Sequence, residues 1–167
     1  IFHNGDQVYL DHNIWYNSTD NVFSSAKDVW IHSDIQNKTE FVRELIRDEY
    51  RKTFACPMSE VISRVPNLMM LDDHEIFNSF GYTIQENNKS SFEYFFATQA
   101  RYVYYQYQRQ LYDDIDFNNF ENTSDEFHYI ILNKIGFLIT DYRGSRGWHG
   151  HTESSHLDKK QTELFKN

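Results

Sequence analysis

The run of residues 68–75 constrains the fold more than any other part of this sequence. Four apolar residues, Leu68-Met69-Met70-Leu71, lead directly into Asp72-Asp73-His74-Glu75. A short apolar run introduced by Val65-Pro66 is typical of a buried strand, which is expected over residues 67–71. Four ionisable side chains at the end of a buried strand are costly unless they bind metal or transfer protons.

Two interpretations of this acidic cluster compete. In a metal site, Asp73 would bind an ion, His74 would donate a proton, and Glu75 would orient the His74 ring. At a helix N-terminus, Asp72 or Asp73 would instead act as the cap, because acidic side chains favour that end of the helix dipole. Capping explains the carboxylates but not the imidazole.

The chain is expected to fold as an α/β domain, in which helices alternate with short strands. Apolar residues recur at helical spacing in two long segments, and Ser91 is placed to open the second. The sequence Asn133-Lys134-Ile135-Gly136 between two short apolar runs predicts a hairpin. Residues 12–37 show no sustained period and are expected to be irregular. The expected helices are 39–54, 57–64, 91–113 and 157–166, and the hairpin strands are 127–132 and 137–141.

Composition limits the possible classes of protein. The chain has 167 residues and a mass of 20.2 kDa, which suits one domain or part of a larger one. Its net charge is −9 and no basic face is visible, which argues against nucleic-acid binding. No run is long enough for a transmembrane helix. A single cysteine, Cys56, excludes an internal disulfide.

A second cluster of polar residues lies near the start, in Gly5-Asp6-Gln7-Val8-Tyr9. The Asp6 carboxylate is a hard oxygen donor that could bridge two cations. A turn would return the Tyr9 phenol toward Asp6, and phenolate is a good ligand for a ferric ion. The alternative is an ordinary turn with a surface aspartate and a core tyrosine.

A third cluster follows the second hairpin strand, in Asp141-Tyr142-Arg143-Gly144-Ser145-Arg146. Two guanidinium groups on one loop suit a phosphate dianion. The alternative is a surface loop in which Asp141 pairs with Arg143.

A nearby loop is rich in glycine and histidine, but such loops often bind metal only adventitiously. Its ionisable residues are His149, His151, Glu153 and His156.

In this order, the segments resemble the PhoD-like branch of the metallophosphoesterases. Residues 2–11 are similar to that family's His-x-Gly-Asp-x-x-Tyr-x-Asp block. Residues 65–76 are similar to its Val-Pro, apolar strand and Asp-Asp-His-Glu block, which is the most specific of the three. Residues 139–146 are similar to its Asp-x-Arg-x-x-Arg block, and residues 157–161 to the helix that follows.

The resemblance implies a layered α/β sandwich, with a mixed sheet flanked by helices, that hydrolyses phosphate esters at a two-metal site. Iron with calcium or manganese would be the metals. Asp6 would bridge them, Tyr9 would bind iron, Asp73 would bind the second metal, and His74 would protonate the leaving group. The substrate would lie near Arg143 and Arg146, and the ligands would be supported by Asp72, Glu75 and Asp141.

The family pattern places further metal-ligand motifs before residue 1 and after residue 167. Residues 1–167 are therefore expected to be the central portion of one PhoD-like domain. A catalytically inactive relative, acting as an interaction or scaffolding domain, is the alternative function. Four Asn-X-Ser/Thr sequons, which begin at Asn17, Asn37, Asn88 and Asn122, give a weak hint of the secretory pathway. The sequence does not determine the compartment or the oligomeric state.

Overall fold

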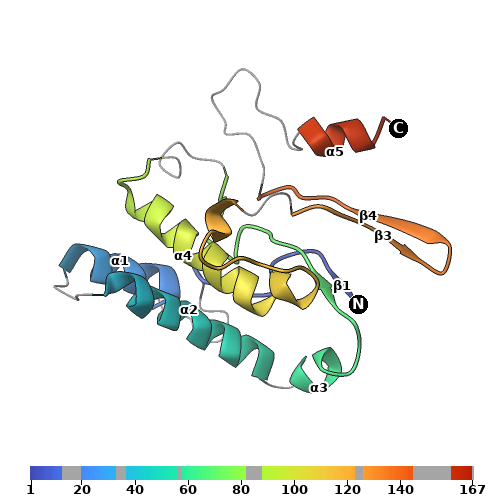
Figure 1. The fold of residues 1–167 in the computed structure, drawn as a ribbon. Helices are drawn as coiled ribbons and strands as arrows, with labels where there is room; N and C mark the ends of the chain where they lie inside the picture. The colour runs from blue at the N-terminus through green and yellow to red at the C-terminus, as the bar shows by residue number, and fades with distance from the viewer. Residues whose placement is uncertain are drawn as a thin grey trace.

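The computed structural model describes residues 1–12, 20–32, 37–55, 58–81, 88–122, 126–144 and 159–166. It combines helices with short strands, which confirms the α/β composition (Figure 1). The helices are α1 (Val22–His32), α2 (Lys38–Ala55), α3 (Met58–Ile62), α4 (Phe92–Tyr107) and α5 (Lys159–Leu164), and two 3-10 turns are η2 (Arg109–Leu111) and η3 (Phe120–Asn122). The strands are β1 (Phe2–His3), β2 (Leu68–Met69), β3 (His128–Leu132) and β4 (Ile135–Ile139).

Helices α1, α2 and α4 pack against one another and form the main core (Figure 1). Val42, Ile46 and Tyr50 lie four residues apart on α2, so they share one face, and all three are fully buried. Among the described residues, none of the helices combines the length and the apolarity that crossing a bilayer requires.

Helix α4 begins where the sequence predicted. The Ser91 hydroxyl accepts a hydrogen bond from the Tyr94 N–H at 3.1 Å, which satisfies one of the free donors of the first turn. The helix ends at Tyr107, earlier than the expected Asp113. A 3-10 turn follows, and in it Arg109 is buried and donates to the Glu126 carboxylate at 2.7 Å.

Helix α1 corrects the expectation that residues 12–37 are irregular. Asn21 caps the helix, since its Oδ1 accepts from the Ser24 N–H at 2.8 Å. The Phe23 ring packs against Phe92 and Phe96 at centroid distances of 5.1 and 5.0 Å. The apolar residues of this segment do recur at helical spacing, but the polar residues before them obscured the pattern.

Strands β1 and β2 pair in parallel, with Phe2 opposite Leu68 and His3 opposite Met69. The pair confirms that the apolar run before Asp72 enters a buried strand, although the strand itself is only two residues long. Because the strands are parallel, their carboxyl ends lie side by side. This arrangement brings the Gly5-Asp6 loop next to the Asp72–Glu75 loop.

The predicted hairpin is confirmed. Strands β3 and β4 pair antiparallel, and Asn133 and Lys134 both have positive φ (49° and 69°), as a two-residue hairpin turn requires. Strand β4 begins at Ile135, two residues before the expected start. The outer part of the hairpin adds little to the core, because Tyr129 and Ile131 are 62% and 64% exposed.

The described residues contain two separate two-stranded sheets instead of the single mixed sheet that was expected. In these residues β4 is hydrogen-bonded to β3 alone, and β2 to β1 alone. A layered sandwich is therefore not seen in the part of the chain that the structure describes. Length explains the difference, because strands of two residues cannot form a wide sheet.

Candidate metal centre

The loop after β1 turns sharply against the loop after β2. Gly5 and Asp6 both have positive φ, 98° and 57°, and a Cβ atom at Gly5 would overlap the Cβ of Asp72. Only glycine permits this close approach. A left-handed aspartate is uncommon, and such residues are held by the structure around them.

Glu75 holds the two loops together. The sequence predicted that Glu75 orients His74, but its fully buried carboxylate instead accepts hydrogen bonds from four backbone N–H groups. The donors and distances are Asp6 (3.2 Å), Gln7 (2.5 Å), Val8 (3.3 Å) and Asp72 (2.8 Å). Burial raises the pKa of Glu75 to about 7, although these four bonds favour the charged form.

Three of the predicted site residues meet between the two loops. Asp6, Asp73 and His74 each offer one ligand atom, and the three atoms lie within 4.8 Å of one another. Asp6 Oδ1 is buried and has no hydrogen-bond partner among the described residues. Carboxylate oxygens and an imidazole suit iron, manganese or zinc, so the residues present fit a transition metal.

The Asp73 carboxylate is kept charged by its neighbours. Burial opposes the charge, but the Ser79 N–H (2.5 Å to Oδ2) and the Arg143 guanidinium (3.3 Å to Oδ1) hold the pKa of Asp73 below its usual range. Asp73 is therefore ionised at neutral pH, as a metal ligand must be. Residues 73–81 form turns and not a helix, so the helix-capping interpretation is wrong.

Asp11 orients His74, a role that sequence reasoning gave to Glu75. The distance from His74 Nδ1 to Asp11 Oδ1 is 2.8 Å, and Asp11 Oδ2 accepts from the Asn78 N–H at 2.6 Å. With Nδ1–H donated to Asp11, Nε2 is the nitrogen left for chemistry. Burial lowers the pKa of His74, but the Asp11 bond and nearby carboxylates outweigh it and raise the pKa overall. Asp11 could have been singled out from the sequence, because it lies five residues after Asp6 in the same motif, residues 2–11.

Tyr9 lies at the edge of the same group. Its ring stacks on His74, with centroids 4.4 Å apart, and its hydroxyl donates to Asp6 Oδ2 over a long 3.4 Å. Burial and the negative charge of Asp6 raise the pKa of Tyr9. Tyr9 would therefore release its proton only to a strongly acidic cation, such as ferric iron.

Arg143 reaches the group from the β4 side. Its Nε donates to Asp72 Oδ1 at 2.6 Å, and its Nη1 donates to the Phe80 carbonyl at 3.1 Å. Asp72 Oδ1 also accepts from the Asp73 N–H at 2.8 Å. Asp72 thus supports Asp73 and Arg143, and Arg143 lies beside the candidate ligand Asp73.

Asp141 shapes the turn that carries Arg143 by accepting hydrogen bonds from its backbone. Asp141 Oδ1 accepts from the N–H groups of Arg143 (2.8 Å) and Gly144 (2.7 Å). The Gln161 side chain on α5 bonds both to the N–H and to the carbonyl of Asp141. Other predicted residues lie outside the described residues: Cys56, Arg146, His149, His151, Glu153 and His156.

A second possible ligand group shares His74. Asp11, His12 and His74 also place three ligand atoms within 4.8 Å of one another. His12 is exposed, and its Nε2 lies 3.9 Å from Asp11 Oδ2. Both Asp11 oxygens already accept hydrogen bonds, so this group suits a cation less well than the first.

Comparison of the chain with family models, with curated proteins and with solved structures gives no match in any of the three. A functional assignment therefore depends on the geometry of the site and on the sequence motifs. The strongest geometric fact is the meeting of Asp6 with Asp73 and His74, from loops far apart in the chain.

Proposed function

We propose that this protein is a metal-dependent phosphoester hydrolase of the PhoD-like type. One observation carries the proposal: Asp6, Asp73 and His74 form one group of candidate ligands at the ends of two parallel strands. Each of these residues belongs to a segment that resembles a site motif of the family. The layered sandwich belongs to the same proposal, with the β1–β2 pair at its centre.

Asp6 and Asp73 are the residues that would hold the metal, and Tyr9 would join them. Iron with calcium or manganese is the proposed metal content. When bound, such ions polarise the phosphoryl group and activate water for attack. The unpartnered Asp6 oxygen supports this role, because a buried carboxylate oxygen without a donor is otherwise costly.

His74 would donate the proton to the departing alkoxide. Its Nδ1–H is held by Asp11, so a second proton would reside on Nε2 and the ring would be a cation. The raised pKa of His74 increases the fraction that carries this proton at neutral pH. Tyr9 stacks on the ring and limits its rotation.

Arg143 would bind a phosphoryl oxygen of the substrate. Its guanidinium lies within 3.3 Å of Asp73 and is 22% exposed, so it borders both the ligand group and solvent. A planar guanidinium can bind two oxygens of a phosphate at once. It would have to exchange part of its contact with Asp72 for the substrate.

The direct test compares phosphoester hydrolysis by the metal-supplied full-length protein with that of Asp73→Ala and His74→Ala. Both variants are expected to lose at least about a hundredfold in kcat/KM, because each removes a group placed in the reaction. Asp114→Ala is the control, since Asp114 is exposed and lies in a loop between η2 and η3. If Asp73→Ala and His74→Ala hydrolyse as fast as the wild type, the proposed mechanism is wrong. If the intact wild type binds no stoichiometric metal, the non-catalytic alternative is favoured.

A further inference from the structure

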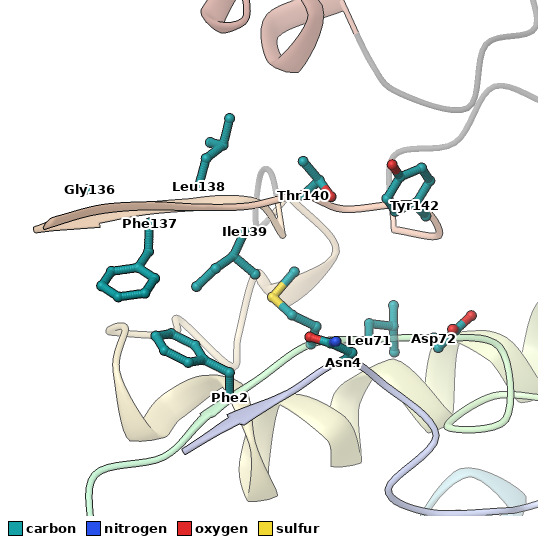
Figure 2. Close-up of a pocket in the computed structure, with 11 residues that line it drawn as sticks. Phe2, Asn4, Leu71, Asp72, Gly136, Phe137, Leu138, Ile139, Thr140 and Tyr142 are labelled. Carbon is teal, nitrogen blue, oxygen red and sulfur yellow. The ribbon is translucent and has the colours of Figure 1, made fainter.

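A cavity of about 520 Å³ lies between β4 and the loop ends of β1 and β2 (Figure 2). In Figure 2, Phe137 and Ile139 point from β4 toward Phe2 and Leu71, whereas Leu138 points to the other side of the strand. A volume of this size falls within the range typical of small-molecule sites. The lining residues are Phe2, Asn4, Met70, Leu71, Asp72, Gly136, Phe137, Leu138, Ile139, Thr140 and Tyr142.

The chemistry of the lining favours an uncharged, apolar occupant. The Phe2 and Phe137 rings, 5.1 Å apart, meet at one end of the cavity. Asp72 is the one charged residue in the lining, and its charge is already paired with Arg143 Nε at 2.6 Å. A charged group inside would find no free partner among these lining residues, whereas a hydrocarbon would bury its surface against four or more apolar side chains.

Asp72 connects this cavity to the candidate metal centre. Its side chain lines the cavity, and its Oδ1 accepts from the Asp73 N–H at 2.8 Å and from Arg143. A phosphoester with its phosphate at Asp73 and Arg143 would therefore have its alcohol portion beside Asp72, at the polar end of the cavity. Asp72 therefore borders both the cavity and the candidate metal centre.

We propose that the cavity binds the apolar alkyl portion of a phosphoester, so that the preferred substrates are phosphate esters of apolar alcohols. This inference rests on the proposed function, because it assigns the substrate class of the same site. The cavity would hold the alkyl chain by burial alone, while Arg143 and the metal centre would hold the phosphate.

Two pairs of compounds test the proposal on the metal-supplied full-length protein. Hexylphosphonate and methylphosphonate, which are not hydrolysed, report binding by calorimetry, and hexyl phosphate and methyl phosphate report kcat/KM. Burial of several methylene groups predicts at least a tenfold preference for the hexyl compound in both measurements. Equal affinity and equal kcat/KM for the hexyl and methyl compounds would overturn the proposal.

Substitutions on β4 test whether this cavity is the source of the preference for the hexyl compound. Ile139→Trp fills the cavity and is expected to remove the hexyl preference, measured as the ratio of kcat/KM for hexyl phosphate to that for methyl phosphate. Ile131→Trp is the control, because Ile131 lies on β3, is 64% exposed and does not line the cavity. If Ile139→Trp does not fold, Ile139→Ala enlarges the cavity and is expected to move the preference from hexyl to octyl. A hexyl preference unchanged in both Ile139 variants would place the alkyl site elsewhere and overturn the proposal.

The two proposals fail in different ways. If methyl phosphate is hydrolysed with metal and the hexyl compounds have no advantage, the hydrolase stands and the apolar site is wrong. If neither ester is hydrolysed, the proposed function is wrong, and the substrate class is wrong with it, even where hexylphosphonate binds.

Discussion

His74 is fixed on two sides, by the Asp11 carboxylate at Nδ1 and by the Tyr9 ring across its face. Its backbone carbonyl also accepts from the Leu10 N–H at 3.1 Å. These contacts come from one loop, residues 9–11, that follows the Asp6 turn. A single segment therefore supplies both a candidate ligand and the groups that orient the candidate acid.

Replacing Asp11 with asparagine tests this arrangement. Asp11→Asn keeps the shape of the side chain but removes the charge that raises the pKa of His74. A lower pKa means that His74 loses its proton at lower pH, so the basic limb of the pH–rate profile is expected to move to lower pH. Activity at neutral pH is expected to fall about 10- to 100-fold, as for other groups that orient a site residue.

The pH–rate profile of Asp114→Asn serves as the control for Asp11→Asn and is expected to match that of the wild type. A basic limb that stays in place in Asp11→Asn would show that His74 is not the proton donor.

Glu75 carries a separate prediction about the metal. Glu75→Gln would set an amide NH2 against backbone N–H donors, so the Asp6 and Asp72 loops are expected to separate. Metal affinity, measured by calorimetry, is expected to fall about 10- to 100-fold. Glu126→Gln is a matched control, because this carboxylate is equally buried but bonds to Arg109 and Tyr104. Equal loss of affinity in both variants would contradict a specific role for Glu75.

The sequence predicted which residues gather at the site better than it predicted what each one does. Asp6, Asp73 and His74 were placed together correctly, because strand ends and family motifs indicate where such residues lie. The partners of Glu75 were not predictable, since three of its four donors are backbone N–H groups of a loop far away in the chain. Asp11 was overlooked because its role depends on how that loop folds back over His74.

At the scale of single elements, the cap of α4 gives a measurable stability effect. Ser91→Ala removes the acceptor of the Tyr94 N–H and is expected to lower the free energy of unfolding by about 1 kcal/mol. Denaturant titration measures this change. Ser90→Ala, one residue earlier and exposed, is expected to have little effect. Equal effects of the two substitutions would contradict the cap.

Strand β3 carries a histidine with a strongly shifted pKa. Burial, together with the positive charge of Arg109, lowers the pKa of His128 to about 4. Between pH 4 and 6.5 the unfolded state binds a proton at this histidine and the folded state does not, so stability is expected to rise as pH rises through this window. The slope from one group is at most about 1.4 kcal/mol per pH unit.

His128→Gln is expected to flatten this part of the stability profile, measured by denaturant titration from pH 4 to 7. His32→Gln is the control, because His32 is an exposed residue at the end of α1. A slope that is the same in the wild type and in His128→Gln would show that the histidine is not shifted.

Elements with a long and regular pattern were predicted well, and short or interrupted ones were not. The apolar face of α2 and the hairpin sequence at residues 133–136 are local signals, so both elements are confirmed, although only Asn133 and Lys134 form the turn. Helix α1 was missed because its six apolar residues follow a long polar stretch. Helix α4 ends two residues before Arg109, which pairs with Glu126 in a tertiary contact that no local pattern contains.

At the scale of the whole molecule, a helical core supports two small sheets, and the candidate metal centre lies on the loops that follow β1 and β2 (Figure 1). Leu10 joins the two parts, since its carbonyl accepts from the Phe23 N–H on α1 and its N–H donates to His74. The order of sheets and layers was the part least accessible from sequence, because strand pairing depends on residues far apart in the chain.

The most direct test of the central claim is the metal content of the full-length protein, measured by mass spectrometry after dialysis, for the wild type and for Asp6→Asn/Asp73→Asn. These substitutions keep the size of both side chains and remove their charge. We expect the wild type to retain stoichiometric transition metal and the double variant to lose it. Equal metal content in the two proteins, or none in either, would contradict a metal centre at Asp6 and Asp73.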